Sequence, residues 1–253
     1  MLHPGACMGG ILLLEDGRRF VGEAFGAATS RVGEAVFNTA MTGYQEILTD
    51  PSYAEQVITM TCPHIGNTGV NEDDPESGKL WASGFVVRQL TRGPSSWRSE
   101  GGLHQYLRRH GIPGLQGIDT RALVRHLRTH GAMKCVVSTD GRSESALRQL
   151  IEDWPGMTGR ALATEVSCAE AWVANDPADA YLRIALVDGG AKRNILRLLK
   201  RANCYVRVHP ITDNADAWSK NVDAVFLSNG PGGPAALPEV IGQVQRVVGT
   251  VPT

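Results

Sequence analysis

The stretch that decides the fold is Val225-Phe226-Leu227-Ser228-Asn229-Gly230-Pro231-Gly232-Gly233-Pro234. A short apolar run leads directly into a turn with three glycines and two prolines. Glycine lets the backbone adopt positive φ and lets a ligand approach without a side chain in the way, while proline stiffens the turn. Backbone N–H groups exposed at the carboxyl end of a strand suit a carboxylate, a carbonyl oxygen or a phosphate. The stretch therefore indicates a ligand-binding loop at the crevice of an open α/β sheet.

The residues around this loop alternate between strand-like and helix-like patterns. Strands are predicted at Ile184–Val187, Tyr205–Val208 and Ala224–Leu227, and helices at Ile195–Ala202 and Val240–Val248. Short connections between strand and helix imply a parallel sheet with right-handed crossovers. Val251-Pro252 has the pattern of a further strand at its beginning. The sequence thus predicts the first half of a doubly wound α/β domain.

The N-terminal half has a different pattern of short strands and separate helices. Asp16-Gly17 between two apolar runs predicts a hairpin, because this pair accepts the positive φ of a tight turn. Strands are predicted at Gln56–Thr61 and Ser83–Arg88. Asp119 can cap a helix that Gly131 ends. The pattern loosens after Trp154, so we expect a first domain at 1–155, a linker at 156–181 and a second domain at 182–253.

The stretch from Glu34 to Tyr53 is rich in short polar side chains and has poor periodicity. On propensity alone it predicts one or two capped turns, with Asp50-Pro51-Ser52 as an Asx-type turn.

Composition excludes several classes of protein. The chain has 253 residues, of which 42% are hydrophobic and 20% charged, and its net charge is -1, as in ordinary globular proteins. No basic tract predicts nucleic-acid binding, no apolar run is long enough for a membrane span, and Met1–Cys7 does not resemble a secretory signal. The five cysteines (Cys7, Cys62, Cys135, Cys168, Cys204) have no paired spacing, which favours a reducing cytoplasm.

No metal site is expected. His126 and His130 are four residues apart on a predicted helix, and a solvated helix face is the favoured interpretation because no third ligand is evident.

Two kinds of chemistry fit the glycine loop. Residues 230–235 match the dinucleotide pattern G-x-G-x-x-A, but prolines in a phosphate turn and a position after the third strand are unusual for it. Alternatively, the loop N–H groups hold the negative charge that develops during acyl transfer. Acyl transfer needs a nucleophile, and no cysteine of the second domain lies at a predicted strand-to-helix elbow. We therefore expect the nucleophile to be absent or to lie beyond Thr253.

Several motifs together resemble those of the glutamine-hydrolysing small subunit of carbamoyl phosphate synthetase, in the order found in that family. They are Phe37–Tyr53, Pro63–Asn67, Asp119–Arg121, Ala191–Ile195 and Leu227–Gly232. The resemblance implies a mixed β/α N-terminal domain specific to the small subunit. It also implies the first part of a flavodoxin-like class I glutamine amidotransferase domain with a parallel sheet.

The resemblance also implies a reaction and a partner. Members hydrolyse L-glutamine with a Cys-His-Glu triad and pass ammonia to the large subunit, which uses ATP and Mg to make carbamoyl phosphate for arginine and pyrimidine synthesis. No cofactor is expected in this chain, and no nucleic acid or membrane as partner. The triad residues are not found in this sequence, so we expect no glutamine hydrolysis by the chain alone.

By the same resemblance, four residues of this chain contact glutamine: Ser52 reaches it from the first domain, Gly230 and Gly232 line the oxyanion site, and Lys192 lies near the substrate. Gly189 and Gly233 depart from the family pattern, which usually has a bulkier residue and an aspartate there. The alternatives are a non-catalytic partner-binding module and a fragment of a dinucleotide-binding oxidoreductase.

Overall fold

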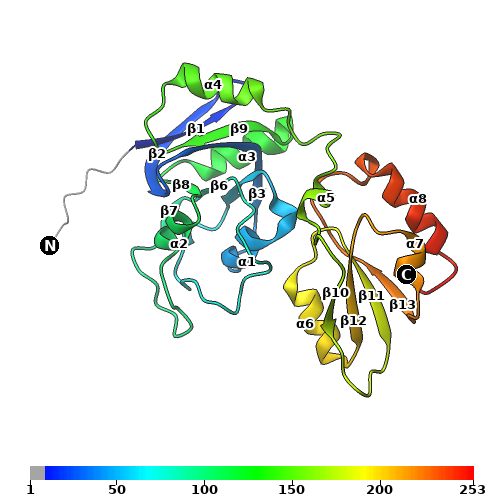
Figure 1. Ribbon diagram of the computed structural model, residues 1–253. Helices are drawn as coiled ribbons and strands as arrows, with labels where there is room; N and C mark the ends of the chain where they lie inside the picture. Colours follow the sequence, from blue (N-terminus) through cyan, green and yellow to red (C-terminus); the bar gives the residue numbers. More distant parts are fainter. Residues whose placement is uncertain (1–8) are drawn as a thin grey trace. The chain divides into compact units, whose positions relative to one another are not determined.

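Residues 9–253 are described by the computed structural model, and they divide into two units (Figure 1). The barrel unit contains residues 9–49, 55–75 and 79–156. The sheet unit contains residues 157–253 together with two short segments from the first half of the chain, 50–54 and 76–78. The prediction about a leader at Met1–Cys7 lies outside the described residues.

Seven strands close the barrel unit into a barrel, in the order β1-β2-β8-β6-β4-β3-β9. Their bounds are β1 Gly9–Leu14, β2 Arg19–Gly26, β3 Ser30–Asn38, β4 Gln56–Met60, β6 Gly84–Val86, β8 Pro113–Gln116 and β9 Met133–Ser138. Parallel and antiparallel pairs are mixed. The pairs β3–β4, β4–β6 and β6–β8 are parallel, whereas β1 pairs antiparallel with both β2 and β9. This is the mixed β/α domain that the resemblance implied, although its closure into a barrel was not predicted.

Helices pack against the strands of the barrel. Leu12 and Leu14 of β1 belong to a core cluster that also includes Leu123 and Leu127 of α3 (Thr120–His130). Leu13 packs in another cluster with residues of α4 (Glu144–Asp153). Strand β1 is therefore buried on both faces, which explains its unbroken apolar run. A third helix, α2 (Leu103–Arg109), packs against β2 and β8, and β5 (His64–Ile65) pairs with β7 (Gln89–Leu90) outside the barrel.

Several local predictions in the barrel unit are confirmed. Strands β1 and β2 form the hairpin, and Gly17 has a φ of 86° in its turn. The Asp119 carboxylate accepts a hydrogen bond from the Ala122 N–H at 2.9 Å, and α3 ends at Gly131, whose φ is 89°. The helix bounds follow from these caps.

His126 does not lie on a solvated face, contrary to the prediction. Its side chain is 8% exposed, its Nε2 lies 2.6 Å from an Asp16 carboxylate oxygen, and its Nδ1 lies 3.1 Å from an Arg18 guanidinium nitrogen. Because Arg18 can only donate, Nδ1 accepts and Nε2 carries the proton that it donates to Asp16. The helical spacing could not reveal this, because both partners come from the distant β1–β2 turn. Within residues 9–253, no group of three metal-ligating side chains is found.

The polar stretch from Glu34 to Tyr53 is more regular than predicted. Its first residues complete strand β3, whose pairing with β4 and β9 outweighs their weak local pattern. Helix α1 (Tyr44–Thr49) follows, and then the short helix η1 (Pro51–Tyr53). The predicted Asx turn is confirmed, since the Asp50 carboxylate accepts a hydrogen bond from the Ser52 N–H at 2.9 Å.

The sheet unit contains a four-stranded sheet in the order β10-β12-β11-β13. The strands are β10 Trp172–Asn175, β11 Arg183–Asp188, β12 Tyr205–Pro210 and β13 Ala224–Leu227. Its helices are α5 Leu162–Val166, α6 Arg193–Arg201, α7 Ala215–Ser219, η2 Pro234–Ala236 and α8 Pro238–Val247. The parallel pairs β11–β12 and β11–β13 confirm the predicted parallel arrangement.

Helices lie on both faces of this sheet. Ile184 and Leu186 of β11 face a cluster with α6, whereas Ala185 and Val187 face a cluster with α7 and α8. Trp218 of α7 is completely buried in the second cluster. The central strand is thus covered on two sides, as doubly wound sheets require.

Three features of the sheet unit differ from the predictions or extend them. Strand β10 pairs antiparallel with β12 and forms one edge. The segment 156–181, predicted as a linker, contains β10 and α5, and the domain bounds remain a prediction. The strand expected at Val251 is only an isolated bridge to Val248, with one hydrogen bond from the Val225 N–H to the Pro252 carbonyl at 2.9 Å.

Candidate ligand-binding site

The loop between β13 and η2 lies at the carboxyl end of the parallel strands. Gly230 packs so closely against the loop after β11 that a Cβ atom at this position would collide with the Gly189 carbonyl oxygen. Gly232 has a φ of 78°, which residues with a Cβ rarely adopt. The loop therefore needs glycine at both positions that the sequence assigned to the site.

Backbone donors in this loop have no acceptor within the described part of the chain. The N–H groups of Gly230, Gly232 and Gly233 take part in none of the hydrogen bonds found among residues 9–253. A cavity of about 380 Å³ adjoins them, and Gly230, Gly232 and Gly233 are among its lining residues. Its other walls are largely apolar and come from β13, α8 and the end of β11. Such donors beside a cavity suit an anionic or carbonyl oxygen of a ligand.

The loop after β11 is fixed by the Asp188 carboxylate. One of its oxygens accepts hydrogen bonds from the N–H groups of Gly190 at 2.9 Å and Ala191 at 2.8 Å, and the other accepts from Cys168 N–H at 2.8 Å. The Ser228 hydroxyl oxygen accepts a further bond from the Gly189 N–H at 2.9 Å. The two loops at the carboxyl edge of the sheet are thus tied to each other.

Residues 50–54 belong to the sheet unit and bring Ser52 to the glycine loop. The Asn229 side-chain amide donates to the Ser52 hydroxyl oxygen at 2.7 Å and to the Gly190 carbonyl at 3.3 Å. A Cβ atom on Gly190 would approach Pro51 Cβ to 3.1 Å and Gly230 Cα to 3.3 Å. The segments around Ser52, Gly190 and Asn229 are distant in the sequence and meet here. They can approach so closely because Gly190 and Gly230 have no side chain to keep them apart.

Lys192 is held by an ion pair instead of pointing freely toward the loop. Its ammonium lies 2.8 Å from a carboxylate oxygen of Asp50, whose side chain is only 4% exposed. Burial opposes the charge on Lys192, but the hydrogen bond to Asp50 and the negative charges of Asp50 and Glu76 outweigh it and raise the lysine pKa above its ordinary value. Asp50 thus connects Lys192 to the Asx turn that presents Ser52.

Glu76 provides the N-terminal acceptors for α6. Its carbonyl accepts a hydrogen bond from the Arg193 N–H, and its carboxylate accepts one from the Asn194 N–H, each at 2.8 Å. These bonds satisfy donors of the first helical turn, and the carboxylate suits the positive end of the helix dipole.

Neither cysteine of the sheet unit, Cys168 or Cys204, provides a reactive thiolate at this loop. Cys204 is buried in the core of the sheet unit. In the barrel unit, burial raises the pKa of the Cys135 thiol far above its ordinary value. Burial and the neighbouring charge of Asp188 raise the pKa of Cys168 to about 12. A thiol with such a pKa is almost entirely protonated at neutral pH and is a poor nucleophile.

Of the four predicted site residues, the structure brings Ser52 and Gly230 to one point, with Gly232 in the same loop. Lys192 reaches this group only through Asp50. The sequence analysis assigned no role to Asn229, Asp188 or Glu76. Asn229 lies within the glycine-rich stretch 225–234, so its amide was a recognisable candidate for holding the loop. Nothing in the sequence places Glu76 at the start of α6.

The two departures from the family pattern have different consequences. A Cβ on Gly233 would meet no atom within 4 Å, so the usual aspartate would fit there. A Cβ on Gly189 would lie 3.2 Å from Ile211 Cδ1, which is tight for any larger residue.

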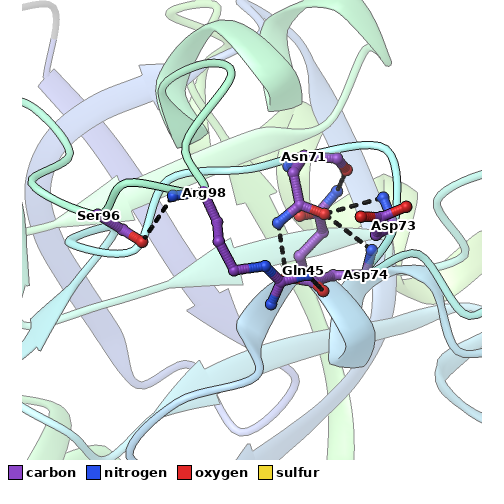
Figure 2. Close-up of polar contacts among 6 residues, drawn as sticks. All are labelled: Gln45, Asn71, Asp73, Asp74, Ser96 and Arg98. Carbon is purple, nitrogen blue, oxygen red and sulfur yellow. Dashed lines mark hydrogen bonds and ion pairs between the residues drawn. The ribbon is translucent and has the colours of Figure 1, made fainter.

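A separate polar cluster in the barrel unit accounts for other polar residues of the stretch from Glu34 to Tyr53 (Figure 2). The buried Gln45 amide donates to the Asn71 carbonyl at 2.7 Å and accepts from the Asn71 N–H at 3.0 Å. The Asn71 side chain donates to Asp74 at 2.7 Å, and Asp74 also pairs with Arg98 at 2.6 Å. This cluster ties α1 to the loop that follows β5, so Gln45 has a structural role.

The sheet unit, with glycine-rich loops at the carboxyl edge of a parallel sheet, has the features of a class I glutamine amidotransferase domain. Residues 185–253 match the family model "Glutamine amidotransferase class-I", and residues 12–137 match "Carbamoyl-phosphate synthase small chain, CPSase domain".

Three relatives named carbamoyl phosphate synthase small chain are similar over nearly the whole sequence. The protein from Syntrophotalea carbinolica is 45% identical over 97% of this chain and 69% of its own length. The Streptomyces avermitilis protein is 45% identical over 94% of the chain and 63% of its own length. The Nitratidesulfovibrio vulgaris protein is 43% identical over 97% of the chain and 70% of its own length. The chain belongs to the carbamoyl phosphate synthase small chain family, whose members are the glutamine amidotransferase part of a ligase, and it spans roughly two thirds of the length of these relatives. This membership rules against the dinucleotide-binding alternative.

Proposed function

We propose that the glycine loop and Ser52 bind L-glutamine, and that the chain acts in a carbamoyl phosphate synthetase as a member of the glutamine-hydrolysing small-subunit family. The observation that carries this proposal is the set of unused N–H groups at Gly230, Gly232 and Gly233, beside the Ser52–Asn229 hydrogen bond. Glutamine offers these groups a carboxylate and an amide carbonyl, both of which accept hydrogen bonds.

Each residue of the site has a distinct role in this proposal. The loop N–H groups bind an oxygen of glutamine and stabilise the negative charge that develops when its amide is attacked. The Ser52 oxygen accepts from Asn229, so its own hydrogen can be donated to the ligand. Lys192 acts through Asp50 and holds the turn that presents Ser52.

The loop N–H groups and Ser52 favour the binding of glutamine, but hydrolysis requires a further group. Hydrolysis in this family's manner needs a thiolate beside the loop, and Cys135, Cys168 and Cys204 do not supply one. We therefore expect the purified chain to bind glutamine without turnover.

The partner in this proposal is the synthetase large subunit, which receives ammonia and uses ATP and Mg to form carbamoyl phosphate for arginine and pyrimidine synthesis. The small chain itself needs no cofactor for this role. No helix within residues 9–253 is long and apolar enough to cross a membrane. The cytoplasm, where unpaired cysteines persist, is the proposed location.

Isothermal titration of the purified chain with L-glutamine tests the binding site, with D-glutamine as the stereochemical control. The variant Ser52→Ala loses one hydrogen bond to the ligand and should bind about tenfold more weakly, equivalent to about 1.4 kcal/mol. A coupled assay for ammonia should remain at the blank level. Equal affinity of wild type and Ser52→Ala, or no binding of L-glutamine at all, would contradict the proposal.

A further inference from the structure

We propose that the barrel unit carries a docking surface for an acidic segment of a partner protein. The surface, called here the arginine groove, is a cavity of about 860 Å³ whose lining includes Arg88, Arg121, Arg125 and Arg128. The proposal goes beyond glutamine binding, and it relies on the proposed function only where it identifies the partner as the synthetase large subunit.

Three of the arginines share one face of helix α3. Arg121, Arg125 and Arg128 are spaced by four and three residues, which places them in a row on the helix surface. The opposite face of α3 is fixed against the barrel by Leu123 and Leu127. The arginine row is therefore held on a rigid support and faces solvent.

The fourth arginine comes from the loop after β6 and is fixed by its own hydrogen bonds. A guanidinium nitrogen of Arg88 donates to the Ile118 carbonyl at 3.0 Å and lies 3.4 Å from the Gly117 carbonyl. These bonds hold the cation in the wall of the groove while leaving its charge without a counterion.

No carboxylate within residues 9–253 forms an ion pair with any of these four arginines. Asp119 also lines the groove, and one of its carboxylate oxygens accepts the hydrogen bond from the Ala122 N–H that caps α3. Four like charges around one cavity repel each other, and an anion that enters the cavity relieves this repulsion. Guanidinium groups also match the geometry of carboxylates.

The arrangement favours an extended polyanion over a compact one. The row from Arg121 to Arg128 covers about 10 Å of helix, so its cations do not converge on a single point. The anion-binding position at the start of α3 is already occupied by the Asp119 carboxylate. Val124 and Pro63 add apolar contact surface between the charges. An acidic peptide can place carboxylates along the row and side-chain methylenes on these residues.

A fluorescein-labelled decaglutamate peptide serves as the probe for direct binding to the full chain. Saturable binding that weakens with added NaCl is expected for the wild type. The charge-reversed variant R121E/R125E should bind roughly 30-fold more weakly, and R121Q/R125Q provides a neutral replacement if charge reversal impairs folding. The control R201E/R207E removes two exposed arginines of the sheet unit and should bind like the wild type.

The proposal is overturned if the wild type shows no saturable binding, or if R121E/R125E binds the peptide like the wild type. It is also overturned if inorganic triphosphate or a short oligodeoxynucleotide binds the groove more tightly than decaglutamate, since a compact anion or nucleic acid would then be the better ligand.

Capture of the purified large subunit from the same organism separates this proposal from the proposed function. Weaker capture by R121E/R125E than by R201E/R207E identifies the large subunit as the partner. Equal capture by both variants overturns the large subunit as the partner that docks at the groove. If the wild type binds decaglutamate through the groove but captures no large subunit, the groove stands and the proposed synthetase partner fails.

Discussion

At the scale of single residues, the hydrogen bond between Asn229 and Ser52 joins two segments of the sheet unit that are far apart in sequence. We predict that Asn229→Ala and Ser52→Ala each lower the free energy of unfolding, and that the double variant costs about 1 kcal/mol less than the sum of the two. The reason is that each single change removes the same hydrogen bond. Urea unfolding of the four proteins measures this coupling energy.

The control pair is Ser52→Ala with Asn67→Ala, because Asn67 lies in the barrel unit and shares no hydrogen bond with Ser52. The effects of this pair should add. Additive effects for Ser52 and Asn229 as well would mean that their hydrogen bond contributes nothing to stability.

The ion pair of Lys192 with Asp50 gives a prediction with a defined pH range. Lys192→Met leaves the nearly buried Asp50 carboxylate without its counterion and should cost about 1–2 kcal/mol at pH 7, less than a fully buried pair because Lys192 is partly exposed. The folded-state pKa of Lys192 is raised, so its contribution is complete below the unfolded pKa of about 10.4 and is lost as pH rises through the folded value.

The stability difference between wild type and Lys192→Met should therefore be constant from pH 6 to pH 9 and shrink above the ordinary lysine pKa. Chemical unfolding across this pH range measures it, and Lys200→Met, on an exposed part of α6, serves as the control. A difference that grows at alkaline pH would contradict the assigned ion pair.

Residues whose partners are close in sequence were predictable. Asp50 and Ser52 are two apart, and Asp119 caps the helix that begins beside it, so local turn and cap rules apply. His126 and Lys192 were misjudged or left vague because their partners, Asp16 and Asp50, are more than a hundred residues away along the chain. No single-sequence pattern records such a distance.

At the scale of elements, the loop after β13 depends on the absence of one particular Cβ atom. Gly230→Ala would place that atom against the Gly189 carbonyl, which is backbone and cannot rotate away. We predict that this variant loses measurable glutamine binding and lowers the free energy of unfolding by about 1–3 kcal/mol. Titration calorimetry and urea unfolding provide the two measurements.

Gly233→Ala is the matched control from the same loop, since its Cβ would enter open space and its φ of −95° suits any residue. It should bind glutamine like the wild type and be slightly more stable, because alanine loses less backbone entropy on folding. If Gly230→Ala and Gly233→Ala behave alike, the close packing of the two loops does not shape the site.

Elements with a strong pattern of their own were predicted well. Strand β11 contains the uninterrupted apolar run 184–187, and α3 begins and ends at recognisable caps. Strands β3 and β10 were not predicted, because their residues are partly polar or exposed and are held by neighbouring strands. Tertiary pairing decides such strands, and propensity is only a weak guide to them.

At the scale of the whole molecule, the sequence predicted the parallel sheet but not the barrel. Alternation of strand and helix dictates a parallel sheet with few alternatives. Closure of the barrel depends on the pairing of β1 with β9, more than a hundred residues later, and both strands would also fit an open sheet. The assignment of residues 50–54 and 76–78 to the sheet unit is equally invisible to local rules, although it delivers Ser52 to the proposed site.

The two units differ in whether their sheet has an unpaired edge strand, and this difference predicts how the chain associates. Within residues 9–253, the barrel has no free edge, whereas β13 forms an edge of the other sheet. On the side away from β11, this strand has only the hydrogen bond from the Val225 N–H to the Pro252 carbonyl. Phe226 and Leu227 on this edge strand are 37% and 39% exposed. Unpaired strand edges with apolar side chains are templates for pairing with a second copy. We expect the chain to self-associate through β13 as its concentration rises.

Phe226→Lys places a charge on this edge and should shift the chain toward monomer, because charged side chains on an edge strand oppose pairing with another strand. Sedimentation velocity over a hundredfold range of protein concentration measures the shift. Val21→Lys is the matched control: Val21 is 67% exposed, but its strand β2 is paired on both sides within the closed barrel, so the same change should leave association as in the wild type. Equal association of the wild type and Phe226→Lys would show that the β13 edge is not the contact, and an effect of Val21→Lys would place the contact on the barrel unit.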